Sequence, residues 1–328
     1  MKEICMVRGG KFMEQNTIAV IWDFDKTLIP GYMQVPIFNA YNVDEKKFWN
    51  ETNSLVDIYR DQGIKVNQDT VYLNHMLTCV KQGIFKGLNN KKLREFGKEL
   101  KFYPGVPEIF KELKDMISKD EKYSLFGIHV EHYIVSTGLT EMIKGSDIKD
   151  YVDGIWGCEF IETPQRSNLV IREDIKDEDE KVIQQIGYIV DNTSKTRAVF
   201  EINKGVNKIS DIDVNGKMEK KDRRVPFENM IYIADGPSDV PVFSVIKQYG
   251  GRTFAIYPKG KEKQFKQVND LIRDGRIDLF AEADYSKNTT AYMWLTSNVK
   301  EIAERIYNDS YDKTVKNSGN APRHITAE

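Results

Sequence analysis

Cysteine is scarce in this chain, which contains only Cys5, Cys79 and Cys158. The three residues are far apart and form no CxxC pair, so the sequence excludes a disulfide-stabilised fold and a cysteine zinc site. The four histidines also lack a metal-ligand spacing such as HxxxH. This cysteine usage fits a reducing compartment, and we expect a cytoplasmic protein.

Long apolar runs and an excess of one charge are missing as well. No stretch approaches the roughly 20 apolar residues of a membrane helix, and the N-terminus lacks the apolar segment of a signal peptide. The 48 Lys and Arg residues against 50 Asp and Glu residues give a net charge of -2. We therefore expect no membrane and no nucleic-acid partner, and any recognition of phosphate must be local. The oligomeric state cannot be predicted.

What is present is a set of short apolar runs separated by helical patterns. With 328 residues, 40% of them hydrophobic, the chain is long enough for one large domain or two modest ones. The predicted strands are TIAVIWDF from residue 17, HYIVSTG at 132–138, IGYIV at 186–190 and MIYIADG at 230–236. Their alternation with helices predicts an α/β fold of three layers, with helices covering both faces of a parallel sheet.

Residues 35–103 differ from the rest, because apolar positions there keep helical spacing with no strand pattern between them. Pro-Gly pairs at 30–31 and 104–105 bracket the segment like hinges. We predict an inserted helical module at 35–103, a core formed by 17–34 and 104–328, and a leader at 1–16.

Three other segments carry weaker patterns. The charged runs at 174–181 and 215–224 are typical of solvated turns. Residues 289–306 predict a docking helix that buries Met293, Val299, Ile302 and Ile306. Beyond Asp312 the tail is polar, and we predict disorder there.

Acidic side chains follow two of the predicted strands. Asp23 and Asp25 end the first, in WDFDKTL, and Asp235 and Asp239 follow another, in ADGPSD. An isolated DxD is more often a pair of loop acids that caps a helix. Four carboxylates that converge at the carboxyl edge of a parallel sheet instead need a cation, and Mg²⁺ prefers oxygen ligands. The grouping therefore favours a magnesium site.

Two further features fit the handling of phosphate. Ser136, Thr137 and Gly138 end a strand, where a hydroxyl and free backbone amides can hold phosphate oxygens, although STG alone is more often a helix cap. Lys195 opens a helical pattern against the helix dipole, so it needs another reason for its place. Neutralising charge between a phosphoryl group and an aspartate is one such reason, and an ordinary surface lysine is the alternative.

The four motifs, in this order, resemble those of the haloacid dehalogenase superfamily, and in particular its phosphoserine phosphatase-like branch. The matching residues are DFDKT at 23–27, STG at 136–138, Lys195 and ADGPSD at 234–239. The resemblance spans residues 17 to about 260, and the long stretch between Lys195 and Asp235 departs from it. It implies a Rossmann-like core with a helical cap after the first motif.

The resemblance also implies a role for each matching residue. Asp23 would be the nucleophile that forms an aspartyl-phosphate, and Asp25 the general acid and base. Magnesium would be held by the Asp23 and Asp235 carboxylates and the Asp25 backbone carbonyl, with Asp239 as an outer or alternate ligand. The phosphate oxygens would be held by Ser136, by the backbone at Thr137 and Gly138, and by Lys195, while Thr27 would order the loop.

The predicted function is hydrolysis of a small phosphorylated metabolite with magnesium. A phosphomutase or phosphotransferase of the same superfamily differs only in protecting the aspartyl-phosphate from water. A catalytically silent binding protein on this fold is a third possibility, which the crowded carboxylates disfavour, since a silent site has no need of them. The physiological substrate is beyond the sequence, although Tyr32, Tyr41 and Arg60 of the cap could face the cleft.

Overall fold

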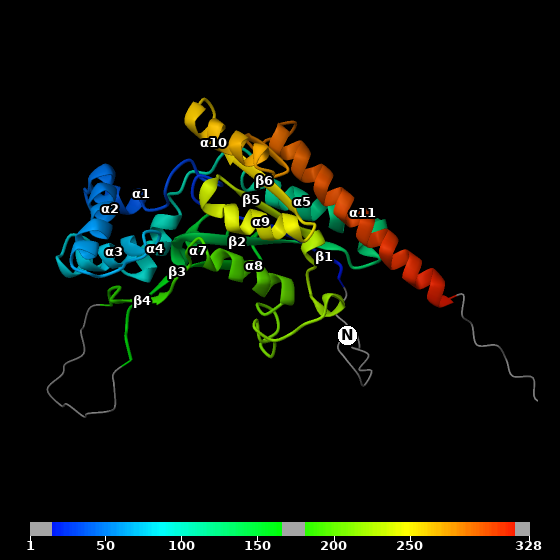
Figure 1. The fold of residues 1–328 in the computed structure, drawn as a ribbon, viewed down its shortest axis with the longest axis horizontal. Helices are drawn as coiled ribbons and strands as arrows, with labels where there is room; N and C mark the ends of the chain where they lie inside the picture. Colours follow the sequence, from blue (N-terminus) through cyan, green and yellow to red (C-terminus); the bar gives the residue numbers. More distant parts are fainter. Residues whose placement is uncertain (1–14, 166–180, 319–328) are drawn as a thin grey trace, which may run out of the picture.

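The computed structural model describes residues 15–165 and 181–318. Its centre is one seven-stranded sheet with the order β4-β3-β2-β1-β5-β6-β7 (Figure 1). All neighbouring strands are parallel except β3 and β4, which are antiparallel. The strands are β1 (Thr17–Trp22), β2 (His129–Leu139), β3 (Gly154–Ile161), β4 (Gln185–Tyr188), β5 (Met230–Ala234), β6 (Arg252–Tyr257) and β7 (Leu279–Glu282).

Helices cover both faces of this sheet. Helices α5 and α11 contact each other and lie on one face, and α8 and α9 contact each other on the opposite face (Figure 1). The core helices are α5 (Glu108–Ser118), α6 (Glu121–Ser124), α7 (Thr140–Gly145), α8 (Ser194–Lys204), α9 (Val240–Gln248), α10 (Glu262–Arg273) and α11 (Thr290–Ser318). Short 3-10 turns lie at Lys220–Asp222, Phe227–Asn229 and Pro237–Asp239. The predicted three-layer α/β fold is therefore confirmed.

Strand β1 shows why the central strands lack alternation of polar and apolar residues. All six of its residues are buried, because helices cover both faces of a parallel sheet. Trp22, at its end, stacks on Phe110 of α5 with 4.8 Å between ring centroids and donates a hydrogen bond to Nδ1 of His132. The chain leaves β1 toward β2 on one side, and β5 joins β1 on the other. The carboxyl end of β1 is therefore the topological switch point of the sheet, where ligands bind in open α/β folds.

The segment between β1 and α5 is helical, and no strand lies within residues 35–103. It contains α1 (Val35–Ala40), α2 (Glu45–Asp61), α3 (Val71–Lys81) and α4 (Asn90–Gly97). In Figure 1 α1, α2 and α3 project to the side of the sheet. The observed helices agree with an inserted cap, while the exact division of the chain at residues 34 and 104 stays a prediction.

Helix α4 is fixed to the core by two glycines. A Cβ at Gly97 would lie 2.1 Å from the carbonyl oxygen of Met142, and one at Gly145 would lie 2.0 Å from that of Arg94. Both positions therefore exclude a side chain, and α4 and α7 touch backbone to backbone.

The sheet contains strands that the sequence analysis missed. Strands β3, β6 and β7 were not predicted. In β3, Gly157 interrupts the apolar pattern of the sequence although the strand is continuous, and β7 has only four residues. The run at 186–190 was predicted to join a parallel sheet, but β4 ends at Tyr188 and runs antiparallel. Its side chains are mostly exposed because it lies at the sheet edge, where one neighbour sets its direction.

The C-terminal helix is longer than predicted. It extends to Ser318, so the prediction of disorder directly after Asp312 is wrong for residues up to 318. Val299, Ile302 and Ile306 are buried as expected, but Met293 is 53% exposed and does not belong to the docking face.

No helix in the described ranges, this long one included, has the apolar character needed to cross a membrane. Residues 1–14 of the leader, 174–180 of the first charged run, Cys5 and His324 lie outside the described residues.

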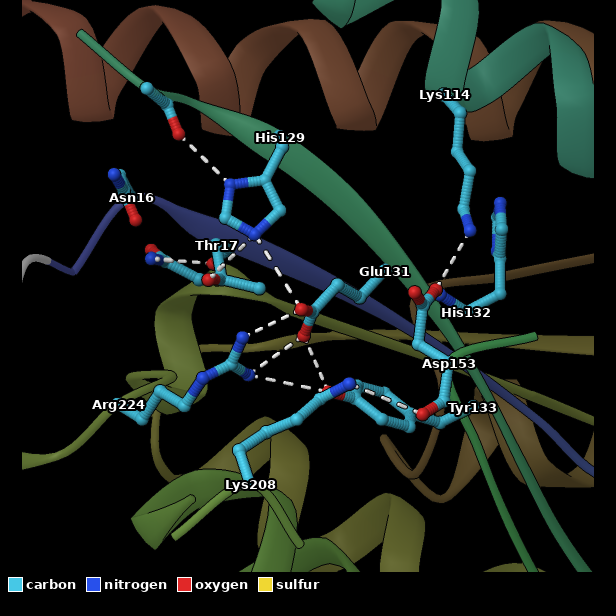
Figure 2. A network of polar contacts seen from close by, with 12 residues as sticks. Asn16, Thr17, Lys114, His129, Glu131, His132, Tyr133, Asp153, Lys208 and Arg224 are labelled. Carbon is cyan, nitrogen blue, oxygen red and sulfur yellow. Dashed lines mark hydrogen bonds and ion pairs between the residues drawn. The ribbon is translucent and has the colours of Figure 1, made fainter. Parts of the chain in front are cut away.

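The basic run at 215–224 ends in a buried ion network rather than in solvent. Figure 2 shows Arg224 reaching Glu131, near the amino end of β2. Its Nη2 and Nη1 atoms lie 2.6 and 2.7 Å from the two carboxylate oxygens, and the Tyr133 hydroxyl donates to the same carboxylate. Nε2 of His129 lies 3.6 Å from Glu131. Burial alone would raise the pKa of Glu131, but hydrogen bonds from His129, Arg224 and Tyr133 hold it well below its usual range.

Candidate active site

The four predicted carboxylates gather at the switch point. Asp23 and Asp25 follow β1, and Asp235 and Asp239 follow the neighbouring parallel strand β5. Carboxylate oxygens of Asp23, Asp235 and Asp239 lie within 4.8 Å of one another. Asp239 is fully buried and Asp23 is 5% exposed. Such crowding of buried acids is costly unless cations balance it.

Lys195 supplies one of those cations. Its ammonium group lies 2.8 Å from Oδ1 of Asp23 and 2.7 Å from Oδ1 of Asp239, and the side chain is 2% exposed. Burial would lower the pKa of this lysine, but the charges of Asp23 and Asp239 outweigh it and raise the pKa. This bridge explains a cation in the first turn of α8, where the helix dipole disfavours it.

Both oxygens of Asp239 accept hydrogen bonds. Oδ1 accepts from Lys195 and, at 2.5 Å, from the Tyr232 hydroxyl, and Oδ2 accepts one from Ser238 at 2.9 Å. Asp239 therefore orients Lys195, and it is also the third carboxylate of the group that could hold a metal ion.

Asp25 lies in a tight turn. Its Oδ1 accepts a hydrogen bond of 3.0 Å from the Met33 amide, and the next residue, Lys26, has a φ of +60°, which few non-glycine residues adopt. Burial first, and then the charge of Asp23, raise the pKa of Asp25 to about 8. A carboxyl group with this pKa holds a proton near neutral pH and can donate it.

Asp235 is the carboxylate without a hydrogen-bond donor among the described residues. Burial and the charges of Asp23 and Asp239 raise its pKa to about 7. Four carboxylates against the two lysines of the site, Lys195 and Lys26, leave two negative charges when all are ionised. A divalent cation matches that excess, and oxygen donors suit Mg²⁺. The residues present therefore fit a metal held by Asp23 and Asp235.

The three residues of the predicted phosphate loop differ in their surroundings. Ser136 is 1% exposed, and its hydroxyl accepts a hydrogen bond from the Gly138 amide at 3.0 Å. A Cβ at Gly138 would lie 2.2 Å from the methyl group of Met33, so the Met33 side chain would have to shift to admit any larger residue there. Thr137 lines the cavity next to Asp23, and its carbonyl oxygen accepts a 2.7 Å hydrogen bond from Tyr72 of α3. Only Thr137 of the three borders the cavity.

A cavity of about 570 Å³ opens from Asp23 toward the helical segment. Its core side includes Asp25, Thr137, Lys195 and Asp235. Its other side comes from α2, α3 and the loops around them, and its lining residues there include Tyr32, Gln34, Trp49, Asn50 and Tyr72.

Of the three cap residues considered from sequence, only Tyr32 borders the cavity. The Tyr41 hydroxyl bonds to the Lys86 carbonyl, and exposed Arg60 pairs with Asp57.

Several contacts of this site were not foreseen. Tyr232, Gln34, Trp49 and Tyr72 were missed, and of these only Tyr232 carries a sequence signal, as a polar-tipped residue in an otherwise apolar strand. Thr27 was assigned to ordering the loop, and its hydroxyl donates to Oδ2 of Asp23 at 3.0 Å.

Comparison with known proteins gives one relative of high coverage. The chain is 38% identical over 289 residues to an uncharacterized protein of Borreliella burgdorferi, an overlap of 87% of this chain and 97% of that protein. No protein-family model matches the sequence.

Some solved structures are similar to this chain at low identity. A HAD family hydrolase of Salmonella enterica serovar Typhi is 14% identical, with 87% of this chain and 72% of that chain covered and a TM-score of 0.49. A phosphoserine phosphatase solved as a phospho-aspartyl intermediate analogue is 18% identical, with coverage of 81% and 93% and a TM-score of 0.45.

The four motifs meet at one edge of a mostly parallel sheet, with a helical segment inserted after the first of them. This arrangement agrees with the fold that the order of the motifs implies. The chain belongs to the same family as the Borreliella burgdorferi protein.

Proposed function

We propose that the protein is a magnesium-dependent phosphomonoester hydrolase that acts on a small phosphorylated metabolite through an aspartyl-phosphate. The observation that carries the proposal is the position of Asp23, which borders the cavity between the cation of Lys195 and the unpartnered carboxylate of Asp235. Thr27 and Lys195 each bond one of its oxygens and fix its orientation. A nucleophile held in this way can attack in line without reorganising. The buried free thiols of Cys79 and Cys158 support the cytoplasmic location.

Two carboxyl groups share the proposed chemistry. An oxygen of Asp23 attacks phosphorus, and the bond from phosphorus to the leaving oxygen breaks as that oxygen takes the proton of Asp25. Asp25, now a carboxylate, accepts a proton from the attacking water, and the bond between Asp23 and phosphorus breaks to release phosphate. The raised pKa of Asp25 supports its role as the acid of the first step.

The transferring oxygens need donors that do not move. Lys195 is held in place by Asp239, to which Tyr232 also donates, and the Thr137 carbonyl is held by Tyr72. Ser136 would contribute through its O–H, which stays available because its hydroxyl only accepts from the Gly138 amide, and the backbone near Thr137 and Gly138 would complete the loop. The Asp23 and Asp235 carboxylates and the Asp25 carbonyl would hold Mg²⁺, which when bound neutralises phosphate charge in the transition state.

The test is hydrolysis of p-nitrophenyl phosphate with and without Mg²⁺. Activity should disappear with chelation and return when Mg²⁺ is added, and full activity after exhaustive chelation would contradict the metal assignment. Acid quenching followed by mass spectrometry should locate the phosphoryl group on Asp23. In Asp25→Asn, turnover should fall about 100-fold to 10000-fold while this phosphoenzyme accumulates, since p-nitrophenolate leaves without a proton. A label on another residue would overturn the roles, and transfer to an added sugar phosphate in preference to water would favour a phosphomutase.

A further inference from the structure

The part of the cavity beyond the carboxylates is rich in carboxamides. Gln34, Asn50, Asn53, Gln68 and Asn192 all line it. A carboxamide carries donors and an acceptor but no charge, so such a wall recognises hydrogen-bonding groups without attracting ions. This half of the cavity is where the leaving group of a phosphate ester would lie if phosphorus is next to Asp23.

Gln34 is a buried polar side chain without a partner. It precedes α1, is 2% exposed and borders the cavity, and its Oε1 accepts no hydrogen bond. A buried polar atom in this state costs roughly 1–3 kcal/mol. A ligand that supplies the missing partner recovers that free energy, which makes Gln34 a candidate for substrate recognition.

Trp49 lines the same cavity and carries a hydrogen-bond donor without an acceptor. Its Nε1 donor is buried and also lacks a partner. The ring lies 4.9 Å from that of Tyr32 and 5.9 Å from that of Tyr72, measured between centroids. The cap side therefore combines an aromatic surface with one unsatisfied acceptor and one unsatisfied donor.

Few charged groups lie on this side of the cavity. Lys46 lines it with Glu45 and Asp69, and no arginine is among the residues that line the cavity in the described part of the chain. Asp69 accepts a hydrogen bond from the Asn192 backbone amide. Since Lys26 is already counted against the catalytic carboxylates, this side carries a charge of -1 and offers no counter-charge to an anionic leaving group.

We propose that this side of the cavity recognises an uncharged, hydroxyl-rich leaving group, so that the substrate is a polyol or sugar monophosphate. The proposal rests on the phosphatase function proposed above. A hydroxyl both donates and accepts, so it can satisfy Gln34 in either orientation of its amide and can accept from Trp49. An ammonium group cannot accept from Trp49, and a carboxylate cannot donate to Gln34.

The test compares two phosphate esters with chains of six carbons, glucitol 6-phosphate and hexyl phosphate. The measured quantity is the ratio of their kcat/KM values with Mg²⁺. Wild type should prefer glucitol 6-phosphate by at least about 10-fold, because a site built for hydroxyls rejects an analogue without them. Gln34→Met, of similar size but without hydrogen-bonding groups, should lower this ratio about 10-fold. The change in ratio cancels the intrinsic reactivity of the esters.

Gln82→Met is the matched control, because Gln82 is exposed at the end of α3 and its substitution should leave the ratio unchanged. Trp49→Phe removes the unpaired Nε1 donor and should also lower the ratio. This variant tests the inference even if Gln34→Met fails to fold. An unchanged ratio in both variants, or equal use of the two esters by wild type, would overturn the inference while phosphatase activity stands. Failure to hydrolyse p-nitrophenyl phosphate with Mg²⁺ would contradict the proposed function itself.

Discussion

Two buried groups of charged side chains lie at opposite ends of the central strands. At the amino end, Glu131 is surrounded by Arg224, His129 and Tyr133, so its charge is balanced and fully hydrogen-bonded. At the carboxyl end, four carboxylates share two lysines, and Asp235 has no donor among the described residues. The pKa of Glu131 is held low, whereas those of Asp25 and Asp235 are raised.

The difference separates a stabilising network from a reactive site. A compensated ion network lowers the free energy of the folded state relative to either partner alone. An ion network without enough counter-charge raises the free energy of the folded state. Such groups persist where a ligand or a reaction uses their charge. We therefore expect substitutions at the two ends to act on different measurements: stability at the amino end and catalysis at the carboxyl end.

The largest expected effect is that of Asp23→Asn. An amide is a poor nucleophile, so kcat/KM for p-nitrophenyl phosphate should fall by about 10000-fold or more, with no phosphoenzyme detected. Glu131→Gln makes the same chemical change at the other end and should keep its activity per folded molecule. Equal losses in the two variants would remove the distinction between the clusters.

Arg224→Met should destabilise the fold without changing catalysis. It leaves the buried Glu131 charge without its main partner, and we expect the free energy of unfolding to fall by about 2–3 kcal/mol. Urea denaturation measures this loss. Arg197→Met is the control, because Arg197 is 59% exposed in its pair with Glu201, and its loss should stay within about 0.5 kcal/mol.

Asp235→Asn should increase the stability of the metal-free protein, in contrast to Arg224→Met. Removing a charge that burial and Asp23 disfavour should raise the free energy of unfolding by about 1–2 kcal/mol. Mg²⁺ at 100 times its Kd should stabilise wild type by about 2.7 kcal/mol and the variant far less. A variant less stable than metal-free wild type would mean that Asp235 is compensated, as Glu131 is.

The smallest effect is expected for Tyr72→Phe, which removes the hydroxyl that holds the Thr137 carbonyl. We expect about a 10-fold lower kcat/KM and weaker inhibition by orthovanadate, since the phosphate loop loses one support. Tyr41→Phe deletes a similar bond, of 3.1 Å to the Lys86 carbonyl, away from the cavity. If orthovanadate inhibits both variants equally strongly, Tyr72 has no positioning role.

The sequence predicted the elements that carry motifs better than those that do not. Strands β1, β2 and β5 are apolar runs followed by polar residues, and because parallel strands end at one edge, Asp23, Thr137 and Asp235 could be expected to meet. Lys195 follows the antiparallel strand β4, so this rule does not place it. Strands β3, β6 and β7 are followed by no motif residue. Gln34 and Trp49 could not be found, because their position depends on how the helical segment docks on the core, which no local pattern encodes.

The glycine contact between α4 and α7 sets how the cavity can open. Gly97 and Gly145 bring the two backbones together with no side chain to slide or swing, so α4 remains with the core. By contrast, α3 and the loop before it reach the catalytic edge through side-chain contacts such as Tyr72 to Thr137 and Asn67 to Asp191. Single hydrogen bonds of this kind break and reform far more readily than a close-packed backbone contact. Any opening that admits substrate would therefore move α3 and the loop before it relative to the core and leave α4 in place.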